Sequence, residues 1–312
     1  MAIKNVKLDN TQYKEVRSKR SINATLDEIE KRLDQEGVNG PVQTPAQKRN
    51  IEMFADQPTT WHKRVVVITG GSAGIGFATA HRFSLYADIV YNLDIEKSED
   101  ENINFIKTDI TNPREVQDSI RKVFNAEGQI DILVNNAGVG ISGTVEELQF
   151  NDILRAVNTN FLGAVAATQA VLPYMRENHK GIIFNIGCQS SIKDAPFTTI
   201  YSASKCALKK FSLGLRKEVS PIKIKVLTIM VPDTKTDFTE NRIKQESNKK
   251  HYKYRLSKAL GKIEYAEQNG ISPDIIAERI YKLSNRKLIL NPVITIGFWN
   301  RVRLFFGKMF RR

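Results

Sequence analysis

Short apolar runs alternate with amphipathic segments along most of the chain, from residue 65 to residue 296. The first run, Val65–Thr69, is a β-branched stretch of the kind found in strands buried on both faces. Similar runs predict further strands at residues 87–93, 104–107, 130–134, 181–186, 224–229 and 288–296. Helical segments separate them, most clearly at residues 113–125, 150–175 and 203–219. This alternation predicts an α/β fold, a doubly wound, Rossmann-like parallel sheet of about seven strands with helices on both faces.

The ends of the chain have a different pattern, which predicts a domain at residues 64–297 flanked by two appendages. Residues 1–63 contain one short amphipathic stretch at 26–35, followed by a linker rich in glycine and proline. This arm is predicted to be partly helical or disordered; a docking arm, an oligomerisation helix and a mobile tail all fit it.

Residues 298–312 predict a basic amphipathic helix, because their aromatic and aliphatic side chains share one arc and their basic side chains lie elsewhere. Such a helix suits the surface of an anionic membrane. Docking onto the domain or onto another subunit is the main alternative. Nucleic-acid binding is disfavoured, because the chain contains no helix-turn-helix or RNA-binding motif.

Charge is concentrated along the chain, whose net charge is +13. Residues 241–263 carry +7 and residues 298–312 carry +5, which indicates an anionic partner such as lipid head groups. The two cysteines, Cys188 and Cys206, suit a reducing compartment. No secretory signal or bilayer-spanning run is recognisable. We therefore expect a cytoplasmic protein, either free or peripheral on the cytoplasmic face of a membrane.

A glycine-rich turn, TGGSAGIG at residues 69–76, stands where the first strand passes into a helix. Glycines there permit a tight turn and close approach of the backbone to a pyrophosphate, which the helix N-terminus also attracts. The expected cradle comprises Thr69, Gly70, Ser72, Gly74, Ile75 and Gly76. Asp94 ends the second strand, where a carboxylate can bind the ribose hydroxyls and repel a 2′-phosphate. These residues predict a dinucleotide site that favours NAD(H) over NADP(H).

Tyr201 and Lys205 are four residues apart, so a helix would place them on one face. A lysine ammonium beside a phenol favours the phenolate, which makes the tyrosine an acid or base nearer neutral pH. No metal site is expected, since the two cysteines and four histidines show no spacing typical of metal ligands.

The order of these motifs resembles that of the short-chain dehydrogenase/reductase family over residues 65–296. The resemblance implies an oligomeric oxidoreductase that transfers hydride between a nicotinamide and the carbonyl or secondary alcohol carbon of a small-molecule substrate. It implies that Tyr201 is the catalytic acid/base and that Lys205 binds the nicotinamide ribose. It also implies that Asn160, in preference to Asn158, supports a water-mediated proton relay. Asp109 and Ile110 would flank the adenine. Five further positions would line the cofactor cleft: Asn136, Ala137 and Gly138 in NNAG, and Pro232 and Thr236 after the sixth strand.

Two departures from the family pattern affect the expected site. Cys188 stands thirteen residues before Tyr201, where relatives have serine, and a thiol is the weaker hydrogen-bond donor. A slower enzyme, replacement by Ser190, and a cofactor-binding scaffold or sensor with little turnover all remain open. Asp233 replaces a glycine and brings a negative charge close to the cofactor. Residues 237–261, the segment that forms the substrate lid in relatives, are rich in lysine. They suit an anionic substrate or carrier, a membrane surface, or a solvated helix that covers the cleft. A hydrophobic substrate is expected from the pattern of residues 298–312 alone.

Overall fold

Seven parallel strands form the central sheet, in the order β3-β2-β1-β4-β6-β7-β9. This computed structural model describes residues 63–189 and 195–297. The strands of the main sheet are β1 (Val65–Thr69), β2 (Ile89–Asp94), β3 (Asn104–Lys107), β4 (Ile132–Asn135), β6 (Gly181–Cys188), β7 (Ile224–Val231) and β9 (Val293–Thr295). The predicted doubly wound sheet is therefore confirmed.

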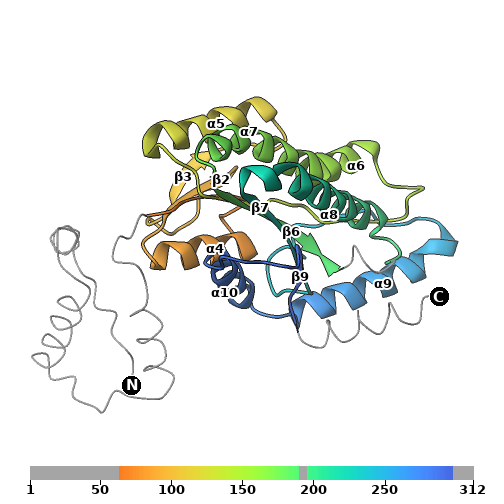
Figure 1. Cartoon of the computed structure of the whole chain (residues 1–312). Helices are drawn as coiled ribbons and strands as arrows, with labels where there is room; N and C mark the ends of the chain where they lie inside the picture. The colour runs from red at the N-terminus through yellow and green to blue at the C-terminus, as the bar shows by residue number, and fades with distance from the viewer. Residues whose placement is uncertain (1–62, 190–194, 298–312) are drawn as a thin grey trace, which may run out of the picture. The chain divides into compact units, whose positions relative to one another are not determined.

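Helices cover both faces of this sheet (Figure 1). Their bounds are α4 (Gly74–Leu85), α5 (Pro113–Glu127), α6 (Phe150–Val157), α7 (Gly163–Glu177), α8 (Thr199–Val219), α9 (Lys250–Gln268) and α10 (Pro273–Ser284). One apolar core lies between the sheet and α5, α7 and α8, and a second lies between the sheet and α4 and α10. None of the described helices has the length and apolar composition needed to cross a membrane.

The sequence of β1 shows why it lies at the centre of the sheet. Val65 and Val67 pack into the core under α5 and α7, whereas Val66 and Ile68 pack into the core under α4 and α10. Since side chains alternate between faces along a strand, only a continuous apolar run can fill both cores.

Three predicted elements differ from the structure in their extent. The helix predicted at residues 150–175 is divided by a π-helical turn, η1 (Asn158–Leu162), into α6 and α7. Its buried Asn160 contacts the chain after β4, so long-range contacts set this break rather than local pattern. Helix α8 begins at Thr199 instead of residue 203, and β9 is only three residues long.

A small second sheet lies beside the carboxyl edge of the main one. It pairs β5 (Ile141–Ser142) with β8 (Ile243–Lys244) in parallel. Two backbone hydrogen bonds extend this pairing, from Ile243 to Gly140 and from Gln245 to Ser142. The segment before α9 is thereby attached to the chain that follows β4. The predicted arm at 1–63 and helix at 298–312 fall outside the described residues, apart from Lys63, so the domain division remains a prediction.

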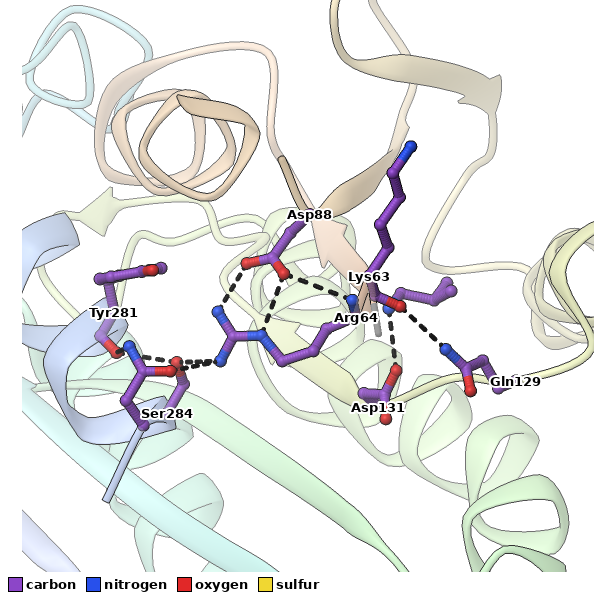
Figure 2. A network of polar contacts seen from close by, with 9 residues as sticks. Lys63, Arg64, Asp88, Gln129, Asp131, Tyr281 and Ser284 are labelled. Atoms are coloured by element: carbon purple, nitrogen blue, oxygen red, sulfur yellow. Dashed lines mark hydrogen bonds and ion pairs between the residues drawn. The ribbon is translucent and has the colours of Figure 1, made fainter. Parts of the chain in front are cut away.

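A polar network around Arg64 connects the amino ends of the central strands (Figure 2). The Arg64 guanidinium forms two hydrogen bonds to Asp88, at 3.0 and 2.6 Å, and reaches Ser284 at the end of α10. Burial raises the pKa of Asp88 against the opposing effect of Arg64. Asp131 accepts from the backbone N–H of Val65 and pairs with Lys180. This network connects β1, β2, β4 and α10 far from the glycine turn.

We expect Arg64→Met to lower the free energy of unfolding by about 2–3 kcal/mol, because it leaves the buried Asp88 carboxylate without its cation. Denaturant unfolding followed by circular dichroism measures this loss. The matched control is Arg121→Met, which removes an exposed ion pair with Asp118 and should change stability little. Equal stability of the two variants would show that the network does not hold the sheet edge.

Candidate active site

The glycine-rich turn lies at the carboxyl end of β1 and leads into α4. Gly70 has a φ of +67°, and a Cβ atom there would lie 2.8 Å from the Ala137 Cα. A Cβ atom at Gly76 would lie 2.0 Å from the Gly70 carbonyl oxygen. Helix α4 begins without a side-chain cap, so its first N–H groups remain available to an anion. The turn therefore fits the pyrophosphate of a dinucleotide.

The NNAG segment is hydrogen bonded to this turn. The Thr69 hydroxyl accepts from the backbone N–H groups of Asn136 and Ala137, both at 3.1 Å. In return the Asn136 amide donates to the carbonyl oxygens of Thr69 and Gly70, at 3.2 and 2.7 Å. These bonds join the carboxyl ends of β1 and β4, as expected for a cofactor cleft at this edge.

Asp94 ends β2 beside the turn. Its carboxylate accepts from the backbone N–H groups of Ser72, at 3.0 Å, and of Ile95, at 2.7 Å. The Ser72 hydroxyl donates to the Glu96 carbonyl oxygen. The structure thus places the predicted acidic residue against the predicted cradle, with its oxygens fixed by backbone donors.

The remaining residues predicted to bind the cofactor differ in their location and burial. Thr236 lies against the glycine turn, with its methyl group 3.2 Å from where a Gly74 Cβ would be. Ile110 is buried against Gly163 at the start of α7, whereas Asp109 is exposed and accepts from Thr111. Ile110 thus packs against α7, whereas Asp109 forms hydrogen bonds within its own loop.

The sequence departure after β7 causes no backbone strain. Asp233 lies outside the left-handed region of φ, and its side chain is exposed. Pro232, before it, accepts at its carbonyl oxygen from the Thr234 hydroxyl. The position therefore tolerates a Cβ atom in this chain.

Tyr201 lies in the first turn of α8 and meets the end of β6. Its phenol and the Cys188 thiol are hydrogen bonded, so the cysteine stands where relatives were expected to have serine. Burial raises the pKa of Tyr201 well above its usual value, and Cys188 adds to this effect. The expectation that Lys205 lowers this pKa was wrong, because desolvation of the phenolate dominates here. Ser190 lies outside the described residues.

Lys205 follows one turn later and is almost completely buried. Its ammonium donates to the Ile186 carbonyl oxygen at 3.1 Å, and burial lowers the pKa of Lys205 to about 8. Asn160 is also buried; its amide oxygen accepts from the Val139 N–H at 2.7 Å, and its nitrogen donates to the Val139 carbonyl at 2.9 Å. Both side chains approach Gly138, within 3.2 Å of where its Cβ would be. The structure therefore brings Tyr201, Lys205, Asn160 and Cys188 to one edge of the sheet.

Three further residues at this end of the sheet were not predicted from the sequence to belong to the site. The Phe238 ring lies 5.8 Å from the Tyr201 ring. The buried Arg242 forms an ion pair with the half-buried Glu267, and both charges act on the Tyr201 phenol. Arg242 belongs to the lysine-rich segment, where nothing in its sequence neighbourhood distinguishes it from exposed basic residues.

We expect Lys205→Met to stabilise the fold at pH 7, by up to about 3 kcal/mol. The pKa of Lys205 falls from 10.5 to about 8 on folding, so its penalty is complete below pH 8. Between pH 8 and 10.5 the unfolded chain binds the extra proton, so wild-type stability rises with pH and the gain of the variant shrinks.

Urea unfolding at pH 7 and at about pH 10 tests this sign. The control is Lys210→Met, an exposed position on the same helix, which should show no such pH dependence. A gain that is absent at pH 7, or unchanged at high pH, would contradict the burial argument.

Comparisons with known proteins agree with this geometry. Residues 64–247 match the family model for short chain dehydrogenases. A 3-ketodihydrosphingosine reductase of Bacteroides thetaiotaomicron is 35% identical over 248 residues, which cover 78% of this chain and 91% of that protein. An NADP-dependent 3-hydroxy acid dehydrogenase of Schizosaccharomyces pombe is 28% identical over 220 residues, covering 65% and 84%. The crystal structure of a short-chain dehydrogenase from Streptomyces avermitilis shares the fold, with a TM-score of 0.70 and 24% identity over 80% of this chain and 93% of that one.

These relatives are oxidoreductases by name, and the alternative of a scaffold without turnover finds no support among them. The family model covers more than half of the chain, including the glycine turn and the Tyr201 helix. The chain therefore belongs to the short chain dehydrogenase family and is an oxidoreductase that uses NAD(P) as its cofactor.

Proposed function

We propose that the protein reduces the carbonyl group of a long-chain 3-ketone, with Tyr201 as the proton donor. The observation that carries this proposal is the half-buried Tyr201 side chain, whose phenol is hydrogen bonded to Cys188 at the end of β6, at the same end of the sheet as the glycine turn. The cofactor, when bound, supplies the hydride that adds to the carbonyl carbon.

Tyr201 is proposed to give its phenolic proton to the carbonyl oxygen of the substrate. A phenol carries a proton at neutral pH and can act as this donor. The Cys188 thiol orients the phenol but is a weaker donor than a serine hydroxyl. Lys205 is proposed to hold the nicotinamide ribose, as in the family. Asn160 is proposed to support a water relay, and its bonds to Val139 keep the adjoining backbone in place.

We propose that a groove between the segment before α8 and helix α9 receives an alkyl chain, although Tyr201 and Cys188 do not line it. It has a volume of about 520 Å³ and lies between residues 195–197, just before α8, and helix α9. Phe197, Ala259 and Ile263 contribute apolar surface, and Arg255, Lys258 and Lys262 contribute positive charge. The name of the Bacteroides relative, a reductase of 3-ketodihydrosphingosine, supports a substrate with a long chain.

We further propose that NADH is preferred over NADPH. Backbone donors hold the Asp94 carboxylate beside the cradle, where it would repel a 2′-phosphate and accept from ribose hydroxyls. The yeast relative is named NADP-dependent, so this preference is assigned to the residue at the end of β2 in this chain and not to the family.

Association with other molecules stays a prediction from the sequence. The family resemblance predicts a homo-oligomer. The basic amphipathic pattern of residues 298–312, which lie outside the described residues, predicts contact with an anionic membrane surface. A cytoplasmic enzyme held peripherally on a membrane would meet a long-chain ketone where such a substrate partitions.

The catalytic roles predict opposite effects of two substitutions. Tyr201→Phe removes the proton donor and should lower kcat for 3-ketodihydrosphingosine by about 10³-fold, with little change in NADH affinity. Cys188→Ser restores a stronger donor beside the phenol and should raise kcat by about tenfold or more. Both are measured from the loss of NADH absorbance with purified protein.

The control for this pair is Cys206→Ser, on the exposed side of α8, which should leave kcat unchanged. Turnover that appears only in Cys188→Ser would mean that the natural chain lacks efficient catalysis. Full activity in Tyr201→Phe would remove the tyrosine from the mechanism.

The cofactor preference depends on Asp94. In Asp94→Ser the repulsion of a 2′-phosphate is lost, so the ratio of NADPH to NADH affinity should rise about tenfold or more. Titrations followed by nicotinamide fluorescence measure both affinities. Glu101→Ser, an exposed acid beyond β2, is the control. An unchanged ratio in Asp94→Ser would assign cofactor selectivity to other residues.

A further inference from the structure

Arg242 is buried in a segment whose other basic residues face solvent. Its side chain is 4% exposed, compared with 40% for Lys244 and 46% for Lys249. A guanidinium is costly to bury unless its donors are paired. A buried arginine next to the proposed proton donor therefore needs an explanation.

Glu267 pairs with Arg242 through one nitrogen of the guanidinium. Arg242 Nη2 donates to Glu267 Oε1, and the other oxygen of Glu267 accepts from the Thr239 hydroxyl at 2.5 Å. Arg242 Nη1 is buried and has no hydrogen-bond partner among the described residues. Both carboxylate oxygens are engaged, so the group that lacks a partner is a donor.

Arg242 lies close to the proposed proton donor. Its Cγ and Nε lie 3.1 and 3.2 Å from where a Gly140 Cβ would be, so the arginine stem fills space that only a glycine leaves open. Phe238 reaches the same point of Gly140, at 3.1 Å, and its ring lies 5.8 Å from that of Tyr201. Arg242 and Phe238 therefore meet at Gly140, beyond the carboxyl end of β4, and Phe238 links this point to Tyr201.

We propose that Arg242 Nη1 is a specificity-determining donor, which binds a neutral hydroxyl group that the substrate carries close to its reacting carbonyl. This inference rests on the proposed reduction of a long-chain 3-ketone. The missing partner of a buried donor is an acceptor, which excludes a substrate ammonium as its ligand. Glu267 already balances the charge of Arg242 and would repel a carboxylate, so a neutral oxygen fits best.

The test compares two ketones that differ in one oxygen, 3-ketodihydrosphingosine and its 1-deoxy analogue, which lacks the hydroxyl on carbon 1. Wild-type protein should reduce the hydroxyl-bearing ketone with a kcat/KM at least about tenfold higher, since the analogue leaves a buried donor unpaired. In Arg242→Met this ratio should fall to about one. A purely structural arginine would lower both rates equally and leave the ratio unchanged.

Two more variants complete the experiment. Arg242→Met with Glu267→Met also removes the carboxylate that would be left unpaired, and it should show the same loss of discrimination even where the single variant folds poorly. Lys253→Met, an exposed position on α9, should keep the wild-type ratio. Circular dichroism melting of each variant reports whether the fold is retained.

The outcomes separate this inference from the proposed function. If the wild type reduces both ketones at similar rates, or if discrimination survives in the Arg242 variants, only the role of Arg242 is overturned. Faster oxidation of a long-chain 3-hydroxy acid than of dihydrosphingosine would identify a carboxylate ligand and also overturn it. If neither ketone is reduced, the proposed substrate class is wrong and the inference fails with it.

Discussion

The bonds between Thr69 and the NNAG segment are the contacts on which the whole site depends. They fasten the glycine turn after β1 to the chain after β4, and Gly70 allows the approach because any larger residue would meet Ala137. The same segment continues to Val139, which Asn160 holds from the π-helical turn. One interlock at the carboxyl edge thus positions both the cofactor cradle and the residues proposed for catalysis.

A buried polar chain extends this order to the helix that carries the tyrosine. The Asn135 amide donates to Asn185 at 2.7 Å, and Asn185 donates to the Ser212 hydroxyl at 2.7 Å, so β4, β6 and α8 are joined inside the core. Paired polar groups of this kind favour one packing of the helix on the sheet, although Asn135 Oδ1 has no partner among the described residues. Lys205 is the exception, because a buried ammonium destabilises the fold. The fold keeps this cation where the proposed chemistry would use it.

The substrate side of the site is built from residues that are distant along the chain. The pairing of β5 with β8 and the ion pair between Arg242 and Glu267 bring the lysine-rich segment against Tyr201. The basic residues of this segment thus lie in two different environments. Arg255, Lys258 and Lys262 line the groove, whereas Arg242 is buried beside the phenol. The structure separates these environments although all four residues belong to the same basic segment, 241–263.

Much of the fold followed from the sequence alone, because its determinants are local. The apolar run of β1, the glycines at 70 and 76 and the four-residue spacing of Tyr201 and Lys205 are short-range patterns, and the structure confirms the elements they predict. The π turn at Asn160, the direction of the pKa shift of Tyr201 and the burial of Arg242 were not predictable. Each depends on desolvation or on a partner from another element, such as Val139, Cys188 or Glu267. Sequence periodicity records which face of an element is apolar, but only tertiary packing decides which polar groups lose their water and what they meet in its place.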